Sequence, residues 1–362
     1  MLGLTQSAEK TMRKIEREMK RIERMEGRAN KRTVGKLYPL ITYTPETSLA
    51  FGGNVLFEHR PLKGDSITSS SFGNLSAIYT LKNQFIVGFG NRAYTKSNKW
   101  FIPGRSALLY FPYTYYGIGN EDETQEDYTS FGFSTQQLFL RRIGKSKHRV
   151  GVHWRLSTAQ INDLDIRGEL VTGQIYGSQG GFTHQLGAAY SFDNRDHLFA
   201  TSSGTFVEVK SLAPLSFVGD EFGFSAIEMD LRKFFALDEQ VLALRSSSAL
   251  QYGNVPFYQL VSLGDQQRMR GYVWGEYRDR FAWFNQAEWR SGFNAYGIGV
   301  AAFAELGAVG SSWEDLTGHW RASFGGGLRL KLDLESKMHL RVDAAYTTDS
   351  NFGVYIGIGE YF

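Results

Sequence analysis

Apolar and polar residues alternate along most of this chain, from Leu37 to its last residue. Between Arg321 and Leu334, one set of alternate positions is apolar or glycine and the other set carries four charges. Successive side chains of a β-strand point to opposite faces, so this pattern predicts strands with one apolar and one polar face. A membrane-spanning barrel and a water-soluble sandwich both alternate in this way, so alternation alone does not separate them.

About sixteen segments show the pattern, an even number as in bacterial single-chain barrels. They are 37–44, 48–60, 70–81, 83–94, 104–114, 127–141, 147–159, 181–193, 204–213, 221–236, 239–251, 280–291, 297–306, 320–333, 337–347 and 352–362.

The lengths of the connections favour the membrane barrel. In an up-and-down order, the long connections all fall at one end, and several turns at the other end are short. The long ones are 115–126, 160–180, 252–279 and 307–319, and the short ones include 237–238 and 334–336. The predicted fold class is therefore all-β, a transmembrane antiparallel β-barrel of about 16 strands over residues 37–362.

Residues 1–36 differ from the rest. Met12, Ile15, Met19 and Ile22 recur at spacings of three and four, which predicts an α-helix with a narrow apolar stripe. Ten Lys or Arg and five Glu between positions 7 and 32 make this helix basic. Two interpretations remain open: a solvated helix held by ion pairs along its own surface, or a helix that docks on a partner or plugs the barrel.

Composition excludes several classes of protein. The chain has no Cys, so disulfides and thiolate metal sites are impossible, and no metal or cofactor is expected. A net charge of +3 gives no support for nucleic-acid binding. No apolar run approaches the ~20 residues of a membrane-spanning helix. Met1–Lys10 lacks the apolar core of a signal peptide, so if the protein is exported, we expect this sequence to be its mature form.

The stretch from Leu263 to Arg280 carries four Arg and no Lys, and all of it except Arg280 lies inside the long connection 252–279. A loop this charged needs an electrostatic partner. Strand parity supplies one, because it turns Phe303 and Glu305 towards the lumen while their neighbours face lipid. We therefore expect the loop to enter the lumen and Arg270 to pair with Glu305. Such a pair would brace the fold or take part in gating, and the sequence leaves both roles open.

Three short patterns occur in a distinctive order: Asp193-Asn194-Arg195-Asp196, then Arg270-Gly271-Tyr272, then Phe303-Ala304-Glu305-Leu306-Gly307. Together they resemble the surface-antigen family of outer-membrane barrels, which includes the BamA and TamA assembly factors and the FhaC-type secretion pores. The resemblance implies that Arg270 pairs with the acid of the third pattern, here Glu305 where Asp is usual. Further matching pieces are Tyr43–Thr47, Tyr116–Asn120 and Phe362.

The chain also departs from this family. The assembly factors carry periplasmic repeat domains ahead of the barrel, whereas only the basic segment stands there in this sequence. Glu360 occupies a position of the terminal assembly signal that is commonly aromatic. The insertase function therefore does not carry over directly.

The seam between the first and last strands is a second candidate site. Pro39 cannot donate to a strand ladder, and Gly353, Gly357 and Gly359 weaken the last strand. The resemblance implies a seam that opens sideways or pairs with client strands. The alternative is that these glycines make room for the loop.

The resemblance implies an outer-membrane location and contact with membrane lipid and lipopolysaccharide. In the leading hypothesis, the N-terminal helix would contact a periplasmic or outer-membrane protein partner or, alternatively, plug the barrel. The leading hypothesis is a non-enzymatic accessory, scaffold or insertase-like factor in outer-membrane protein assembly or translocation. A translocation pore plugged by the loop or helix is the alternative. A lipid-modifying enzyme comes third, because only the scattered His184, Asp193 and His197 would serve it and no catalytic motif is present.

Overall fold

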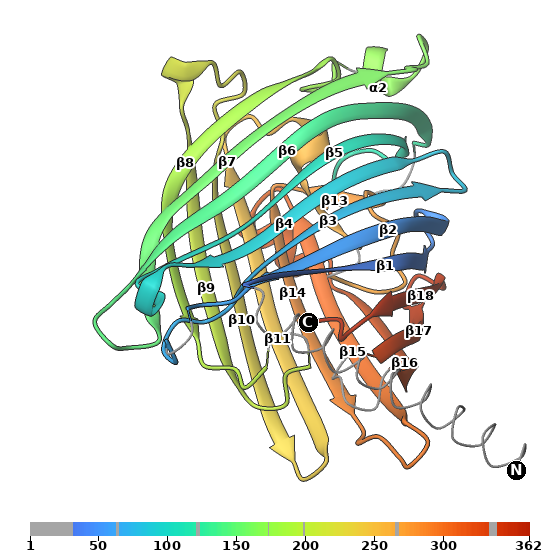
Figure 1. Cartoon of the computed structure of the whole chain (residues 1–362). Helices are drawn as coiled ribbons and strands as arrows, with labels where there is room; N and C mark the ends of the chain where they lie inside the picture. The colour runs from blue at the N-terminus through green and yellow to red at the C-terminus, as the bar shows by residue number, and fades with distance from the viewer. Residues whose placement is uncertain are drawn as a thin grey trace, which may run out of the picture.

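The computed structural model describes residues 32–62, 65–120, 124–172, 174–197, 200–264, 268–332 and 339–362. They form a closed barrel of sixteen antiparallel strands and a separate two-stranded sheet, β12–β13 (Figure 1). The barrel strands are β1 (Thr33–Thr44), β2 (Ser48–His59), β3 (Ser71–Thr80), β4 (Phe85–Tyr94), β5 (Trp100–Tyr115), β6 (Glu126–Arg142), β7 (His148–Asn162), β8 (Gly180–Asp193), β9 (Gly204–Pro214), β10 (Ser225–Leu237), β11 (Gln240–Tyr252), β14 (Phe281–Arg290), β15 (Ile298–Gly310), β16 (Arg321–Lys331), β17 (His339–Thr347) and β18 (Phe352–Ile358).

The expected fold class is confirmed, and each expected segment overlaps one barrel strand. Strands that follow one another in the barrel pair along their length, and β11 pairs with β14 across the inserted loop. β1 begins at Thr33, four residues before the expected start, because its pairing with β2 continues back to Thr33 opposite His59. The helix expected before it lies outside the described residues.

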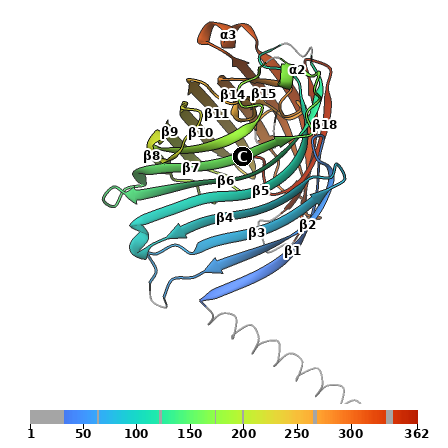
Figure 2. The same ribbon diagram turned by 90° about the horizontal axis from the view of Figure 1, so that it is seen from above.

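The strands close into a continuous wall (Figure 2), and the two faces of this wall differ chemically. On β15, Ile298 and Val300 are about 40% exposed on the outer face, whereas Phe303 and Glu305 are buried in the lumen. The same alternation leaves many large apolar side chains on the outside, where a lipid environment would cover them. Among the described residues, no helix has the length and apolar character needed to cross a membrane.

The two ends of the barrel differ. At the end where β1 begins and β18 finishes, here called the terminal end, the connections include the turn between β10 and β11. The opposite end, here called the loop end, carries the longer connections with α2 (Glu169–Thr172), η2 (Ser216–Val218) and α3 (Trp313–Gly318), whereas η1 (Lys96–Asn98) lies at the terminal end. The connection after β11 holds η3 (Phe257–Gln259), β12 (Val261–Leu263) and β13 (Tyr277–Asp279).

The expectation for the last strand is wrong in one respect. Alternation predicts a strand through Phe362, but β18 ends at Ile358 and the backbone turns at Gly359, whose φ is +81°. Continued in register, the strand would place Glu360 on the same outward face as Phe352 and Ile358, and a carboxylate facing lipid is unfavourable. Tyr361 and Phe362 are instead buried inside, and both views place the end of the chain within the barrel outline (Figures 1 and 2).

Candidate functional site

Arg270, at the tip of the inserted loop, is fully buried in the lumen against β15. Its main-chain N–H donates to Glu305 Oε2 at 2.6 Å, and its Nε donates to Glu305 Oε1 at 3.0 Å. The parity argument thus identifies the residue that Arg270 contacts. Gln286 Nε2 and Ser323 Oγ also donate to this carboxylate, at 3.1 and 3.0 Å, and hold it in place from both neighbouring strands.

Glu305 is not the only partner. Arg270 Nη1 donates to Glu288 Oε2 on β14 and to Asp343 Oδ2 on β17, each at 2.8 Å. The guanidinium also lies over two aromatic rings, 3.4 Å from the centroid of Phe303 and 4.0 Å from that of Tyr361. One loop residue therefore ties together β14, β15, β17 and the C-terminal segment.

A wider ion network surrounds this centre. Arg329 reaches Asp343 at 2.6 Å, Glu360 at 2.9 Å and Glu288 at 3.4 Å, and Arg290 reaches Glu288 at 2.8 Å. With Arg341 on Asp343, the described residues of this network contain four guanidiniums and four carboxylates: Arg270, Arg290, Arg329 and Arg341 with Glu288, Glu305, Asp343 and Glu360. The charges balance, which lets so many buried ions coexist.

Sequence reasoning identified only the Arg270–Glu305 pair. Parity does place Arg329 and Asp343 on the lumen face, but it cannot say which lumen side chains one loop tip will reach. Glu360 is part of the network because the tail turns inward, where His339 Nε2 lies 3.1 Å from its carboxylate.

The residues next to Arg270 hold the loop by close packing. Gly271 has φ +99°, and a Cβ there would lie 2.5 Å from Thr347 Cγ2. Its N–H donates to the Tyr355 hydroxyl at 2.8 Å, and the Tyr272 hydroxyl donates to the Ala322 carbonyl at 3.2 Å. On β15, a Cβ at Gly307 would lie 2.2 Å from Met269 Sδ, so the third sequence pattern needs glycine for close approach of the loop.

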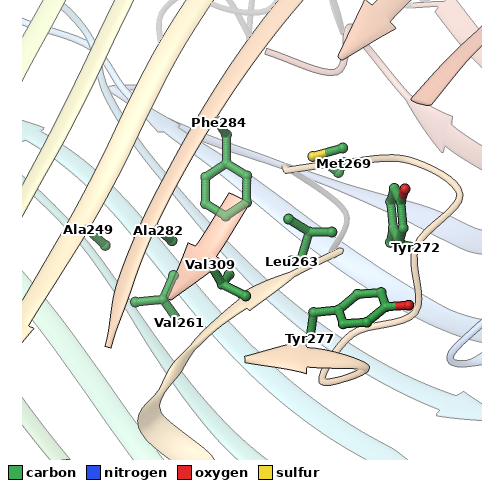
Figure 3. Packing of buried hydrophobic residues seen from close by; sticks show 9 residues of the cluster. All are labelled: Ala249, Val261, Leu263, Met269, Tyr272, Tyr277, Ala282, Phe284 and Val309. Atoms are coloured by element: carbon green, nitrogen blue, oxygen red, sulfur yellow. The ribbon is translucent and has the colours of Figure 1, made fainter. Parts of the chain in front are cut away.

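An apolar cluster fixes the remainder of the loop to the wall (Figure 3). Leu263 and Met269 of the loop lie beside Phe284 and Val309 of β14 and β15, and the Tyr272 ring meets that of Tyr277 edge-on, with centroids 6.0 Å apart. Val261, Tyr277, Ala249 and Ala282 complete the cluster. The loop is therefore a packed part of the lumen rather than a cover lying over it.

The seam between β1 and β18 is narrow. The two strands pair at a single position, Tyr43 with Ile356, supported by a 2.5 Å hydrogen bond from Thr42 Oγ1 to the Ile356 carbonyl. By contrast, β1 and β2 pair along twelve positions. The part of β1 from Thr33 to Ile41, which includes Pro39, has no strand partner on its β18 side among the described residues.

The glycines and the end of β18 lie on the lumen side of this seam. A Cβ on Gly353 would come within 3.2 Å of Gly271 Cα, so the last strand and the loop meet through two glycines. A Cβ on Gly357 would lie 3.3 Å from Arg341 Nη2. Phe362, expected at the end of a full-length strand, packs instead against Phe234 and Ala243 in the lumen.

Two features of this barrel can be compared with known barrels: a loop anchored in the lumen by an arginine, and a seam between β1 and β18 with little strand pairing. The model of the Omp85 superfamily domain matches residues 39–362. The chain belongs to the Omp85 superfamily. This confirms the resemblance that the three sequence patterns indicated. None of the curated protein sequences compared with this chain matches it.

Solved Omp85 structures share the fold. The chain is similar to BamA from Haemophilus ducreyi lacking POTRA domains 1–3, with TM-score 0.61 and 13% identity, over 91% of this chain and 70% of that one. It is also similar to CdiB from Acinetobacter baumannii, with TM-score 0.58 and 12% identity, and to CdiB from Escherichia coli, with TM-score 0.57 and 11% identity. Each CdiB match covers 91% of this chain and 60% or 62% of that chain, so this chain spans about three-fifths of those proteins.

In this Omp85 barrel the strand-8 motif closes a turn at the terminal end. Arg195 Nε and Nη2 donate to the Asp193 carboxylate at 2.9 and 2.8 Å, and the guanidinium lies 4.5 Å from the centroid of the Phe206 ring. Asp196 accepts bonds from the N–H groups of His197, Ser202 and Ser203 and from the Ser202 hydroxyl. Burial opposes ionisation of Asp196, but these bonds lower its pKa below the usual value.

The three residues considered for catalysis do not assemble. His184 faces outward and accepts a 2.8 Å hydrogen bond from Trp154 Nε1, whereas Asp193 is held by Arg195 inside the lumen, nine residues further along the same strand. His197 lies in the turn beyond. Among the residues that the structure describes, no group of three His, Asp or Glu side chains is placed to hold a metal ion.

Proposed function

We propose that this Omp85 barrel is a non-enzymatic outer-membrane factor that assists the assembly or translocation of other chains through its β1 edge. The observation that carries the proposal is the single paired position between β1 and β18. A sheet edge with unsatisfied main-chain groups is a template for an added strand, and a barrel normally has no such edge.

The features of the lumen support the same function. The tail turns away from β1 at Gly359 and is held inside by Arg290 and Arg329 on Glu360, so it does not occupy the β1 edge. Arg270 braces β14, β15 and β17 from within, which lets the barrel keep its shape while the seam is weak. Contact with membrane lipid follows from the apolar outer face, and the terminal end would face the periplasm.

A pore is the second candidate. Two adjoining cavities of about 480 and 460 Å³ lie in the lumen beside the inserted loop and share the lining residues Arg105 and Arg268. A translocation pore should conduct in planar bilayers, and removal of residues 1–31 should raise the conductance if that segment blocks it. Absence of conductance in both the full chain and the shortened chain would exclude a pore.

Locking the seam tests the leading proposal. The natural chain has no Cys, so Tyr43→Cys with Ile356→Cys introduces one defined pair at the position where β1 and β18 pair. The matched control, Val209→Cys with Met229→Cys, bridges β9 and β10 elsewhere in the wall. In cells of the native host, we expect the seam lock to reduce the amount of other folded outer-membrane proteins and a reductant to restore it. Normal amounts in the locked cells, with the disulfide demonstrably formed, would refute the proposal.

A further inference from the structure

Three arginines on the lumen wall near the terminal end lack the carboxylate partners that surround Arg270. Arg92 lies on β4, Arg142 on β6 and Arg149 on β7; together they are here called the arginine row. The Nε atom of each is buried without a hydrogen-bond partner. Among the described residues, no ion pair joins any of the three to an acid. Asp193, which lies at this end on β8, is already bound in bidentate fashion by Arg195.

An aromatic side chain sets the spacing of the row. The ring of buried Phe101 has the Arg92 guanidinium 4.9 Å from its centroid and the Arg149 guanidinium 5.3 Å from it. Tyr94 stacks on the same ring at 4.6 Å. Arg142 is the direct cross-strand partner of Arg149, and like charges directly opposite each other destabilise a sheet. Anionic groups placed between the arginines would relieve this repulsion and accept charge-assisted hydrogen bonds.

The ligand must reach the row through the lumen. The row faces inward, so the wall separates it from membrane lipid. Of the row, Arg92 lines the cavity of about 480 Å³, together with Phe101. This cavity also contains Glu208, Glu228 and Asp230, which are paired with Lys210, Arg155, Arg232 and Arg245. It extends to Arg105 and Arg268, where it adjoins the second cavity under the loop. A chain entering from the terminal end therefore passes the row before it reaches the loop.

The terminal rim beside the row is basic as well. The turn between β4 and β5 carries Lys96 and Lys99, and the hairpin between β6 and β7 carries Lys145 and Lys147, all exposed. The Arg142 N–H donates to the Lys99 carbonyl at 2.9 Å and joins the two turns. Residues 141–149 contain no acid. Such a rim attracts negatively charged chains and raises their rate of encounter.

We propose that the arginine row is a recognition site for an acidic polypeptide segment that enters the lumen in extended form from the terminal end. From β4 to β7 is three strand spacings, about 14 Å, which equals the span of three side chains at alternate positions of an extended strand. The row is unevenly spaced, with two strand spacings, about 9.5 Å, from β4 to β6 and one, about 4.8 Å, from β6 to β7. Acidic residues at i, i+2 and i+4 stand about 6.7 Å apart, and the long arginine side chains can make up the difference, so that each acid meets one guanidinium. Residues 1–31 carry nine Lys or Arg and five Glu, so their net charge disfavours them as the occupant. The inference rests on the proposed role in handling other chains.

Peptide binding to the full chain in detergent tests this inference. The probe is a fluorescently labelled ten-residue peptide of alternating Glu and Thr, compared by anisotropy with a peptide of alternating Gln and Thr. The row variant carries Arg92→Gln, Arg142→Gln and Arg149→Gln. The rim variant, with Lys99→Gln, Lys145→Gln and Lys147→Gln, removes the same charge from the neighbouring surface.

We expect the acidic peptide to bind the natural chain more tightly than the Gln peptide, and the row variant to lose at least about tenfold in affinity, because it removes charge-assisted hydrogen bonds. The rim variant should lose less, since exposed charges are screened. If the row variant does not give the heat-modifiable folded form, the single change Arg149→Gln should still weaken binding several-fold.

Equal binding of the two peptides, unchanged affinity of the row variant, or an equal loss in the rim variant would each overturn the inference. Displacement of the peptide by phosphatidylglycerol vesicles or by inorganic phosphate at matched charge would assign the row to a phosphate group and also overturn it. The seam-locked protein should bind the peptide normally, because β4–β7 lie away from the seam. A negative result for peptide binding at the arginine row can therefore be distinguished from a negative result for the proposed function of the seam.

Discussion

Arg270 Nη2 and Glu305 Oε1 lie 2.8 Å apart, and both side chains are fully buried. Loss of one partner would leave the other charge stranded, which costs ~3–5 kcal/mol. We expect Arg270→Ala to lower the urea concentration at the unfolding midpoint in micelles and to reduce the heat-modifiable folded fraction. Arg270→Lys should recover little of this loss, because a single ammonium cannot make the two-sided contacts of a guanidinium.

Exchanging the charges at positions 270 and 305 tests whether Arg270 and Glu305 form an isolated ion pair or belong to a network. For an isolated pair, Arg270→Asp combined with Glu305→Arg would restore stability. Here the new Asp at position 270 would face Glu288 and Asp343, which now accept from Arg270 Nη1. We therefore expect the double variant to remain unstable, and full restoration would contradict the network.

Gly271 is expected to be required for close packing as well as for its backbone conformation. Gly271→Ala should destabilise the barrel more than Gly119→Ala. Both glycines have positive φ, +99° and +104°, but only Gly271 has atoms within reach of a new Cβ. The backbone strain is common to both variants, so the difference between their unfolding midpoints isolates the contact with Thr347. Equal midpoints would show that the loop tip is not tightly packed.

The inward turn of the tail predicts which cysteine pairs can form. If β18 continued along β1 in the register of Tyr43 and Ile356, Pro39 would lie opposite Glu360. We expect Pro39→Cys with Glu360→Cys to remain reduced under oxidation on a non-reducing gel, whereas Tyr43→Cys with Ile356→Cys forms a disulfide. Efficient formation of the 39–360 bond would place the tail on β1 and contradict an inward turn.

Asp196 should make stability depend on pH. Its pKa is lowered in the folded protein, so its contribution is fully present above the unfolded value of about 3.9 and is lost as the pH falls through the folded value. Asp196→Asn should therefore lower the urea midpoint near neutral pH, and the difference from the natural chain should shrink as the pH falls below about 4. A difference that stays constant with pH would assign the effect to lost hydrogen bonds alone.

The sequence predicts much of the barrel because lipid and lumen impose a period of two on every strand. The same parity places Glu305 in the lumen and makes it available to Arg270. It does not reveal that Glu288 and Asp343 share the guanidinium, since that depends on how deeply the loop descends. The sequence contains a sign of the inward tail, because Glu360 would face lipid if the strand continued to Phe362. The alternating pattern of 352–362 alone predicts one continuous strand and does not reveal the turn. The arginine row was also missed, because alternation treats every lumen charge as equivalent.

The claim that the β1 edge receives partner strands is tested most directly by site-specific photo-crosslinking in cells. A photoreactive residue at Leu37, on the part of β1 beyond its pairing with β18, should form adducts with other outer-membrane barrel chains. The same residue at Leu231, on the continuous outer wall of β10, should form few. The disulfide between positions 43 and 356 should abolish the Leu37 adducts. Equal adducts from both positions, or Leu37 adducts that persist in the locked protein, would contradict the account.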